Sequence, residues 1–179
     1  MLSYRVDVSS ILDDLGATEV VQGTFALTQL TVGDAAFTLL EPPAFVVNLT
    51  NTGTGLVADG TIKAHADTEC SRCLERFETF IEGAVEAFYV PHAHEYAIPD
   101  DQETEPILPD GTVDLAPALV AALTLEAPFA PIHDESCEGL CPHCGRNLNI
   151  ERCSCTTEVD EAHPFAVLKD LLEDTPDAR

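Results

Sequence analysis

The first ninety residues show the hydrophobic pattern of β-strands. Short apolar runs and alternation of apolar with polar side chains, enriched in valine, threonine and phenylalanine, recur along this region. They occupy residues 4–9, 20–30, 43–50 and 56–70. Residues 76–90 fit either a strand with a bulge near Gly83 or a short helix, and their β-branched and aromatic content favours the strand. Gly-Thr-Gly at 53–55 and Asp-Gly at 59–60 are typical of turns.

The second half of the chain predicts a loop and two helices. Residues 91–110 hold four prolines and six acidic residues, which predicts an exposed acidic loop. A helix is predicted over 114–125, because Asp114 can cap its start, Pro117 falls in its first turn and Pro128 follows its end. Near the C-terminus, four apolar residues fall on one helical face, which predicts a C-terminal helix. They are Phe165, Leu168, Leu171 and Leu172.

These elements together predict an α+β fold in two parts. Residues 1–130 form a β-rich core domain, with an antiparallel sheet or barrel-like core, the acidic loop 91–110 and one packed helix. Residues 131–179 form a small cysteine-rich lobe with the C-terminal helix. The N-terminus lacks a signal-peptide pattern, and the apolar run at 115–125 is too short to span a bilayer. We therefore expect a soluble cytoplasmic protein with no membrane partner.

Charge narrows the classes of partner. The chain has 32 acidic residues against 8 lysines and arginines, a formal net charge of −24. Between Arg76 and Arg146 there is no basic residue except histidine, while fourteen acidic residues occur there. Nonspecific nucleic-acid binding requires clustered cations, so the charge disfavours direct wrapping of RNA over most of the surface. Such a surface keeps the protein soluble, and it also attracts a basic partner.

Five of the seven cysteines lie between Cys137 and Cys155, and three kinds of chemistry could explain them. An odd number of cysteines in a cytoplasmic chain disfavours a disulfide scaffold. The two Cys-x-x-Cys pairs lack the strand–helix context of a thiol oxidoreductase. There is also no ordered Ser/His/Asp set and no phosphate-binding glycine loop. The sequence therefore supports neither catalysis nor a small-molecule substrate.

Spacing favours a structural metal. Cys141-Pro-His-Cys144-Gly145 is typical of a zinc knuckle, because two intervening residues let both sulfurs reach one tetrahedral ion and Gly145 can adopt a positive φ. Cys153 and Cys155 can supply the second pair of ligands. Four thiolates on Zn²⁺ carry a net charge of −2, which the neighbouring Arg146 and Arg152 can offset. A site saturated with sulfur stabilises a fold and does not activate water.

One cysteine in this stretch is surplus. Cys137 could replace Cys153 or Cys155 in the knuckle site. Alternatively it could join Cys70 and Cys73 in a second site. His133 or His143 could complete that second site. The sequence thus predicts one structural zinc site and leaves a second site open.

Several motifs resemble the YceD family, the large ribosomal RNA subunit accumulation proteins. The resemblance rests on four stretches in order over roughly residues 60–170. They are Cys70-Ser-Arg-Cys73-Leu, the acidic insertion before Val113-Asp114-Leu115, Ala130-Pro-Ile-His-Asp134 leading into CEGLCPHCGRNLN, and His163-Pro-Phe-Ala-Val-Leu168. The resemblance implies a bacterial, non-enzymatic protein that supports accumulation of 23S ribosomal RNA and maturation of the large subunit. It also implies that Cys70, Cys73 and Cys137 form one group of cysteines, and that the other four cysteines form the second group.

Three functional hypotheses combine this resemblance with the charge. In the first, the acidic surface, with the loop 91–110 as the main contact, binds a basic ribosomal protein or assembly factor, and any effect on rRNA is indirect. In the second, the zinc knuckle contacts rRNA directly through Arg146 and Arg152, with Asn147 and Asn149 beside them. In the third, the protein is a redox sensor in which an oxidant releases zinc and joins Cys141 to Cys144.

Overall fold

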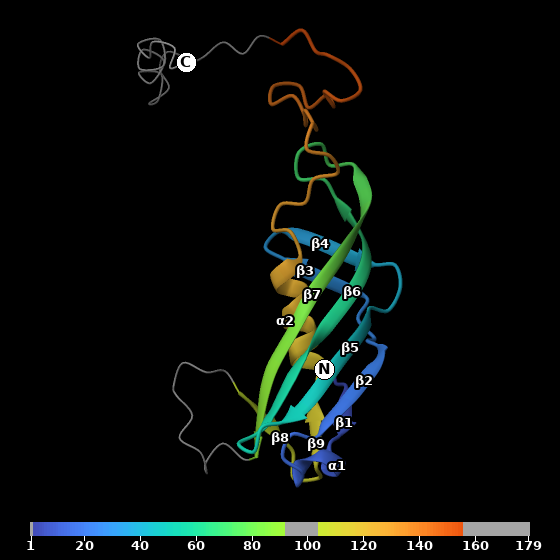
Figure 1. The fold of residues 1–179 in the computed structure, drawn as a ribbon. Helices are drawn as coiled ribbons and strands as arrows, with labels where there is room; N and C mark the ends of the chain where they lie inside the picture. The colour runs from blue at the N-terminus through green and yellow to red at the C-terminus, as the bar shows by residue number, and fades with distance from the viewer. Residues whose placement is uncertain (1, 92–103, 156–179) are drawn as a thin grey trace, which may run out of the picture. The chain divides into compact units, whose positions relative to one another are not determined.

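The chain divides into two compact units, Met1–Cys137 and Glu138–Arg179, in a computed structural model that describes residues 2–91 and 104–155 (Figure 1). Most of the predicted acidic loop and the whole predicted C-terminal helix lie outside the described residues. Within the described residues, no helix has the length and apolar character needed to cross a membrane.

The first unit is built on a seven-stranded, mostly antiparallel sheet with the order β2-β5-β6-β4-β3, in which β7 pairs with the other edge of β6 and β8 pairs with β7 in parallel. The strands are β2 (Thr18–Thr24), β3 (Gln29–Val32), β4 (Ala35–Leu39), β5 (Ala44–Asn51), β6 (Leu56–Glu69), β7 (Arg76–Pro91) and β8 (Glu105–Ile107). A second, two-stranded sheet pairs β1 (Arg5–Asp7) with β9 (Thr112–Asp114). The helices are α1 (Ser9–Leu12) and α2 (Ala116–Glu126).

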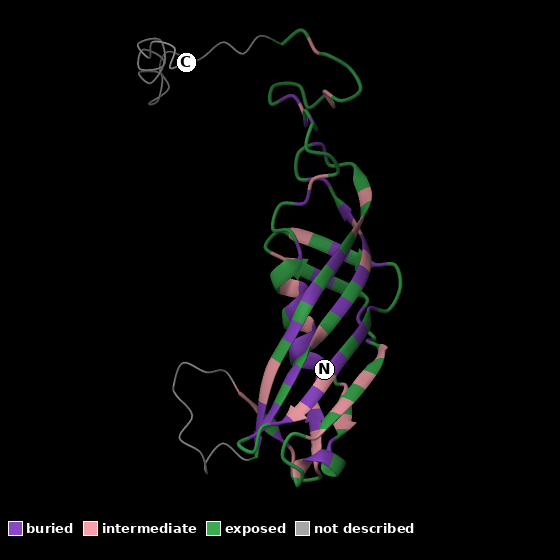
Figure 2. Cartoon of the chain, viewed as in Figure 1, coloured by how far each residue is buried: buried purple, intermediate pink, exposed green. Residues whose placement is uncertain are grey.

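The hairpin of β6 and β7 is the longest element of the sheet. Its pairing is continuous from Leu56↔Tyr89 to Glu69↔Arg76, and buried residues alternate with exposed ones along both strands (Figure 2). The prediction of a strand at 76–90 is confirmed. The bulge at Gly83 is wrong, since Gly83 pairs directly with Ile62.

The turn predicted at Asp59-Gly60 is also wrong. Gly60 lies inside β6 and pairs with Val47 on one side and Val85 on the other. A Cβ at Gly60 would lie 2.1 Å from the carbonyl oxygen of Val46. Glycine is therefore required here by the close approach of neighbouring backbone rather than by a change of chain direction. The turn predicted at 53–55 does connect β5 to β6.

Helix α2 packs on the buried face of the hairpin. Its buried residues are Ala116, Ala118, Leu119, Ala122 and Leu123, and they join the core side chains of the sheet. The Asp114 carboxylate accepts the N–H of Ala116 at 3.0 Å and the N–H of Tyr4 at 2.8 Å. Asp114 thus connects the first residue of α2 to the N-terminal segment. The cap predicted at Asp114 is displaced by one residue, since the N-cap position is Leu115, which makes no side-chain capping bond.

Gly83, on the buried face of β7, is a point of close approach between α2 and the sheet. A Cβ there would lie 2.4 Å from the carbonyl oxygen of Ala122. We expect Gly83→Val to lower the free energy of unfolding by about 1–3 kcal/mol, because the helix must move away from the sheet. Urea denaturation measures this effect. Ala84→Val, at the adjacent exposed position, is the matched control, and equal losses in both variants would contradict the packing argument.

The architecture is broadly α+β, as predicted. The sheet is mostly antiparallel and carries two helices, and cysteine-rich groups follow toward the C-terminus. Barrel-like closure is not found among the described strands, since β2, β3 and β7 do not pair with one another. The predicted loop 91–110 is corrected at its C-terminal end, where Glu105–Ile107 forms β8.

Candidate metal centres

The seven cysteines gather into two groups, one in each unit. The first group, centre A, consists of Cys70, Cys73, His133 and Cys137. The second group, centre B, consists of Cys141, Cys144, Cys153 and Cys155. Within each group the four sulfur or nitrogen ligand atoms lie within 4.8 Å of one another, so each group could hold a metal ion. No disulfide joins any of these cysteines, all of which lie in the described part of the chain.

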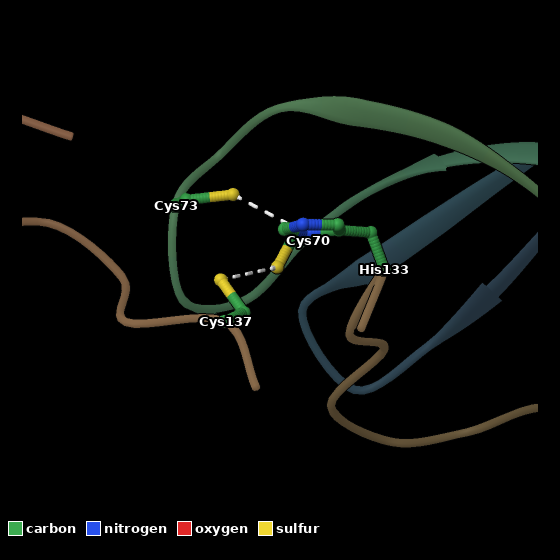
Figure 3. Close-up of side chains that lie close together, drawn as sticks. All are labelled: Cys70, Cys73, His133 and Cys137. Carbon is green, nitrogen blue, oxygen red and sulfur yellow. Dashed lines mark hydrogen bonds between the residues drawn. The ribbon is translucent and has the colours of Figure 1, made fainter. Parts of the chain in front are cut away.

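Centre A joins the tip of the β6–β7 hairpin to the segment after α2. The hairpin supplies Cys70 and Cys73, and the later segment supplies His133 and Cys137 (Figure 3). The N–H of Ser71 donates to the carbonyl of Pro131 at 2.7 Å. These two parts of the chain are therefore held together by backbone bonding as well as by the ligand side chains.

Arg72 connects the same two parts of the chain through its side chain. Its Nη1 donates to the carbonyl oxygens of Glu135 at 2.9 Å and Cys137 at 3.0 Å. The guanidinium thus fixes the backbone that carries the ligand Cys137. Sequence reasoning did not assign Arg72 this role, and no local signal distinguishes it from an exposed cation.

The distances in centre A fit a tetrahedral ion. The Cys70 and Cys137 sulfurs are 3.9 Å apart, and the Cys73 sulfur is 3.5 Å from Nδ1 of His133 (Figure 3). Around tetrahedral Zn²⁺, the usual bond lengths place two sulfurs about 3.8 Å apart and a sulfur and a nitrogen about 3.6 Å apart. Three thiolates and one imidazole are also a ligand set that structural zinc sites use.

The two Cys-x-x-Cys loops have the same backbone geometry. In centre B, the N–H of Gly145 donates to the carbonyl of Cys141 at 2.8 Å, and the N–H of Cys141 donates to the carbonyl of Arg146 at 2.8 Å. Gly145 has a φ of +71°, which confirms the positive φ predicted for it. This pattern of two bonds around a left-handed residue closes the turn so that both sulfurs lie on the same side of it.

Centre A repeats this turn without a glycine. The N–H of Leu74 donates to the carbonyl of Cys70 at 2.9 Å, and the N–H of Cys70 donates to the carbonyl of Glu75 at 2.9 Å. Leu74 has a φ of +62°, the one positive value among the described non-glycine residues. A left-handed leucine is strained, so the surrounding contacts must hold the turn in this conformation.

Backbone N–H groups point at the first cysteine of each pair. Burial raises the pKa of the Cys70 thiol, but hydrogen bonds from the backbone of His133, Cys73 and Arg72 and from the His133 ring outweigh it and lower the pKa to about 5. The backbone N–H groups of Cys144 and His143 lower the pKa of Cys141 to about 6. Each centre thus stabilises one thiolate even without an ion, which prepares it for a cation.

Two thiols, one in each centre, hold their protons more tightly than a free thiol. Burial, with the Cys70 and Cys137 sulfurs beside it, raises the pKa of Cys73 to about 11. The Cys144 sulfur, with burial, raises the pKa of Cys155 to about 12. Crowded thiolates repel one another, so all the thiols of a centre, three in centre A and four in centre B, can ionise together only when a cation neutralises them.

Gly145 allows a direct test of the knuckle turn in centre B. No atom lies within 4 Å of a Cβ at this position, so only the backbone conformation opposes a side chain there. We expect Gly145→Ala to weaken zinc binding to centre B by about tenfold, since a left-handed alanine costs about 1–2 kcal/mol. Competition with a chromophoric chelator measures this. Leu74→Gly in centre A is the matched control, and it should not weaken zinc binding there.

The structure places each cysteine predicted as a ligand in one of the two groups. It brings Cys141, Cys144, Cys153 and Cys155 together, and it places the surplus Cys137 with Cys70 and Cys73. Of the two histidines left open, His133 is in centre A and His143 belongs to neither centre.

The predicted RNA-contact residues have partners within the second unit. Arg146 lies 3.6 Å from the carboxylate of Glu151. Oδ1 of Asn147 accepts from Asn149, whose own Oδ1 accepts the N–H of Glu138 at 2.8 Å. Both asparagines therefore have a structural role in the turn. Arg152 is exposed.

Comparison with known families identifies the chain. The family model described as "Large ribosomal RNA subunit accumulation protein YceD" matches residues 58–172, more than half of the chain. The chain belongs to the YceD family. The match to this family includes most of β6, all of β7 and α2, and every cysteine of both centres.

Two mycobacterial proteins are similar to about half of the chain. An uncharacterized protein of Mycobacterium tuberculosis (strain ATCC 25618 / H37Rv) is 34% identical over 98 residues, which are 54% of this chain and 47% of the relative. An uncharacterized protein of Mycobacterium leprae (strain TN) is 29% identical over 92 residues, or 51% of this chain and 42% of the relative. The matched segment thus spans about half the length of these relatives. No solved structure matches the chain.

Proposed function

We propose that this protein supports accumulation of large-subunit ribosomal RNA as a non-enzymatic ribosome-biogenesis factor. The observation that carries the proposal is the YceD family match over residues 58–172. In this proposal the protein binds a basic ribosomal protein or assembly factor through its acidic surface, and its effect on rRNA is indirect.

Two structural zinc ions are part of the proposal. Each centre offers four ligands from cysteine and histidine, so an ion held by all four has no open position for water or substrate. The role of the ions is therefore to stabilise the fold. Centre A would tie the hairpin tip to the segment 131–137, and centre B would hold the second unit together.

The distribution of cations supports a basic protein partner. Lys63 lies 3.0 Å from the Glu82 carboxylate, and Arg76 forms an ion pair with Asp67 through Nη2. Arg72 donates to backbone carbonyls, and Arg146 faces Glu151. Four of the six lysines and arginines of the described residues thus serve internal contacts, while the net charge of −24 remains for a partner of opposite sign.

A pull-down from cell lysate at low and high salt tests the proposal. We expect basic ribosomal proteins or assembly factors to bind at about 50 mM salt and to be released at about 500 mM, because screening weakens contacts between exposed charges. The control uses an unrelated protein of similar net charge. Capture of mainly acidic proteins, or retention unchanged by salt, would contradict the proposal. So would tight binding of purified protein to a 23S rRNA fragment that is lost in Arg146→Ala.

A further inference from the structure

Strand β7 is an edge strand over most of its length. Its described partners are β6 on one side and, at residues 89–91 only, β8 on the other. Between Arg76 and Phe88 no described strand pairs with the outer edge of β7. Figure 1 shows β7 at the margin of the sheet. An open edge of this length is a template for pairing with another extended chain.

The register shows which backbone groups are open on this edge. In an antiparallel pair, the N–H and C=O of successive residues point alternately toward and away from the neighbouring strand. The N–H of Cys70 donates to the carbonyl of Glu75 across the hairpin, so odd-numbered residues of β7 face β6. Even-numbered residues then face outward. They are Glu78, Phe80, Glu82, Ala84 and Glu86, and no described group bonds to their backbone.

The same residues present their side chains on the exposed face of the sheet (Figure 2). Helix α2 covers the opposite face, where Gly83 lies against Ala122. Phe80 is 79% exposed and stacks on His65, with ring centroids 4.3 Å apart. The outer edge of β7 therefore combines open backbone groups, an accessible aromatic ring and a row of three glutamates.

One end of this row has excess negative charge. Glu78 and Glu82 have partners on β6, in His65 and Lys63. Glu86 instead lies directly opposite Asp59. Neither carboxylate forms an ion pair with any cation of the described residues. Like charges directly opposite one another on a sheet are unfavourable, and a lysine or arginine placed beside them would relieve this.

We propose that the outer edge of β7 binds an extended, lysine- or arginine-rich segment of a partner protein by β-strand addition. Backbone hydrogen bonds to the outward residues Glu78–Glu86 supply the pairing, and a cation of the added strand lies beside Glu86 and offsets the negative charge that Glu86 shares with Asp59. This inference rests on the proposed function and specifies where and how the basic partner binds. A second copy of this chain fits poorly, since it would bring the three glutamates of each edge into one short interface between like-charged strands.

Two matched proline variants test the edge itself. Ala84→Pro removes an outward N–H and leaves the β6–β7 bonds in place, because proline is tolerated on strand edges. The N–H of Phe25 donates to the carbonyl of Pro43, so odd-numbered residues of β2 face β5 and even-numbered residues face outward. Gln22→Pro therefore removes an outward N–H from the other edge of the sheet and leaves the β2–β5 bonds in place. The probe is a labelled decapeptide of alternating lysine and valine, followed by fluorescence anisotropy at low salt. We expect Ala84→Pro to weaken binding at least tenfold and Gln22→Pro to change it less than twofold.

Amide hydrogen exchange of the unmodified protein provides a readout that does not depend on a variant folding. The peptide should slow exchange at the N–H groups of Phe80, Glu82 and Ala84. Peptide binding without this protection, or equal binding by both proline variants, would overturn strand addition. The proposed binding of a basic partner through the acidic surface would not be affected by that result. Protection of these amides in a dimer formed without peptide would assign the edge to a second copy and overturn the proposal. Failure of the lysate pull-down would instead count against the proposed function.

Discussion

Replacement of Cys70 by serine is expected to remove one of two zinc ions per chain and to lower the free energy of unfolding of the first unit by more than about 4 kcal/mol. Loss of a metal is among the few single changes with effects this large. Cys70 is fully buried and lies 3.9 Å from the sulfur of Cys137, across two parts of the chain far apart in sequence. Metal-binding energy there is folding energy, because the unfolded chain does not hold these ligands together.

Metal analysis and urea denaturation check this prediction together. Ser71→Ala is the matched control, since it alters the next residue of the same turn and leaves the N–H of Ser71 on Pro131. The control should retain two zinc ions and its stability. If Cys70→Ser retained both ions, or lost one with no change in stability, the structural role of centre A would be wrong.

Replacement of Cys144 by serine is expected to disorder the second unit and leave the first unit intact. Centre B draws all four ligands from residues 141–155, and its turn is held by bonds among the same residues. A small lobe of this kind has little apolar core to replace a lost ion. Zinc affinity at this centre should fall by more than about 100-fold, a larger loss than outer-shell changes cause.

Backbone NMR spectra measure this effect residue by residue. Amide signals from residues 138–155 should collapse toward random-coil positions in Cys144→Ser, while those of β6 and β7 should remain. His143→Ala is the matched control, because His143 neighbours the same ligand and belongs to neither centre. Collapse in the control as well, or loss of the β6 and β7 signals in Cys144→Ser, would contradict the independence of the two centres.

Local patterns in the sequence were sufficient for the main elements. Alternation identified β6 and β7, because one face of an antiparallel sheet is buried and the other is exposed. The aspartate and prolines around residues 114–128 identified α2. In centre B, ligand spacing together with Gly145 predicted a turn whose backbone the structure reproduces. Each of these signals acts between residues close in sequence.

Features that depend on tertiary contacts could not be predicted in this way. Gly60 and Gly83 were interpreted as a turn and a bulge, yet both are required by backbone that comes from elsewhere in the chain. The choice between His133 and His143 depends on which one the fold brings to the hairpin tip. Leu74 carried no signal at all, since leucine rarely adopts the positive φ that its turn requires.

One short hairpin was missed although its signal is local. Gly33-Asp34 connects β3 to β4 as a two-residue turn, and Gly33 has a φ of +58°. A glycine–aspartate pair between two apolar runs is typical of such hairpins. The run from 20 to 30 was interpreted as a single strand, which obscured the break between β2 and β3.

The zinc content of protein purified without chelator shows whether both groups of ligands hold a metal ion. We expect about two zinc ions per chain, one for each group of four ligands. One ion per chain would show that only one of the two turns is a metal site. No zinc in a folded protein would contradict the account, because the thiols of both centres would then be held together by something other than a metal ion.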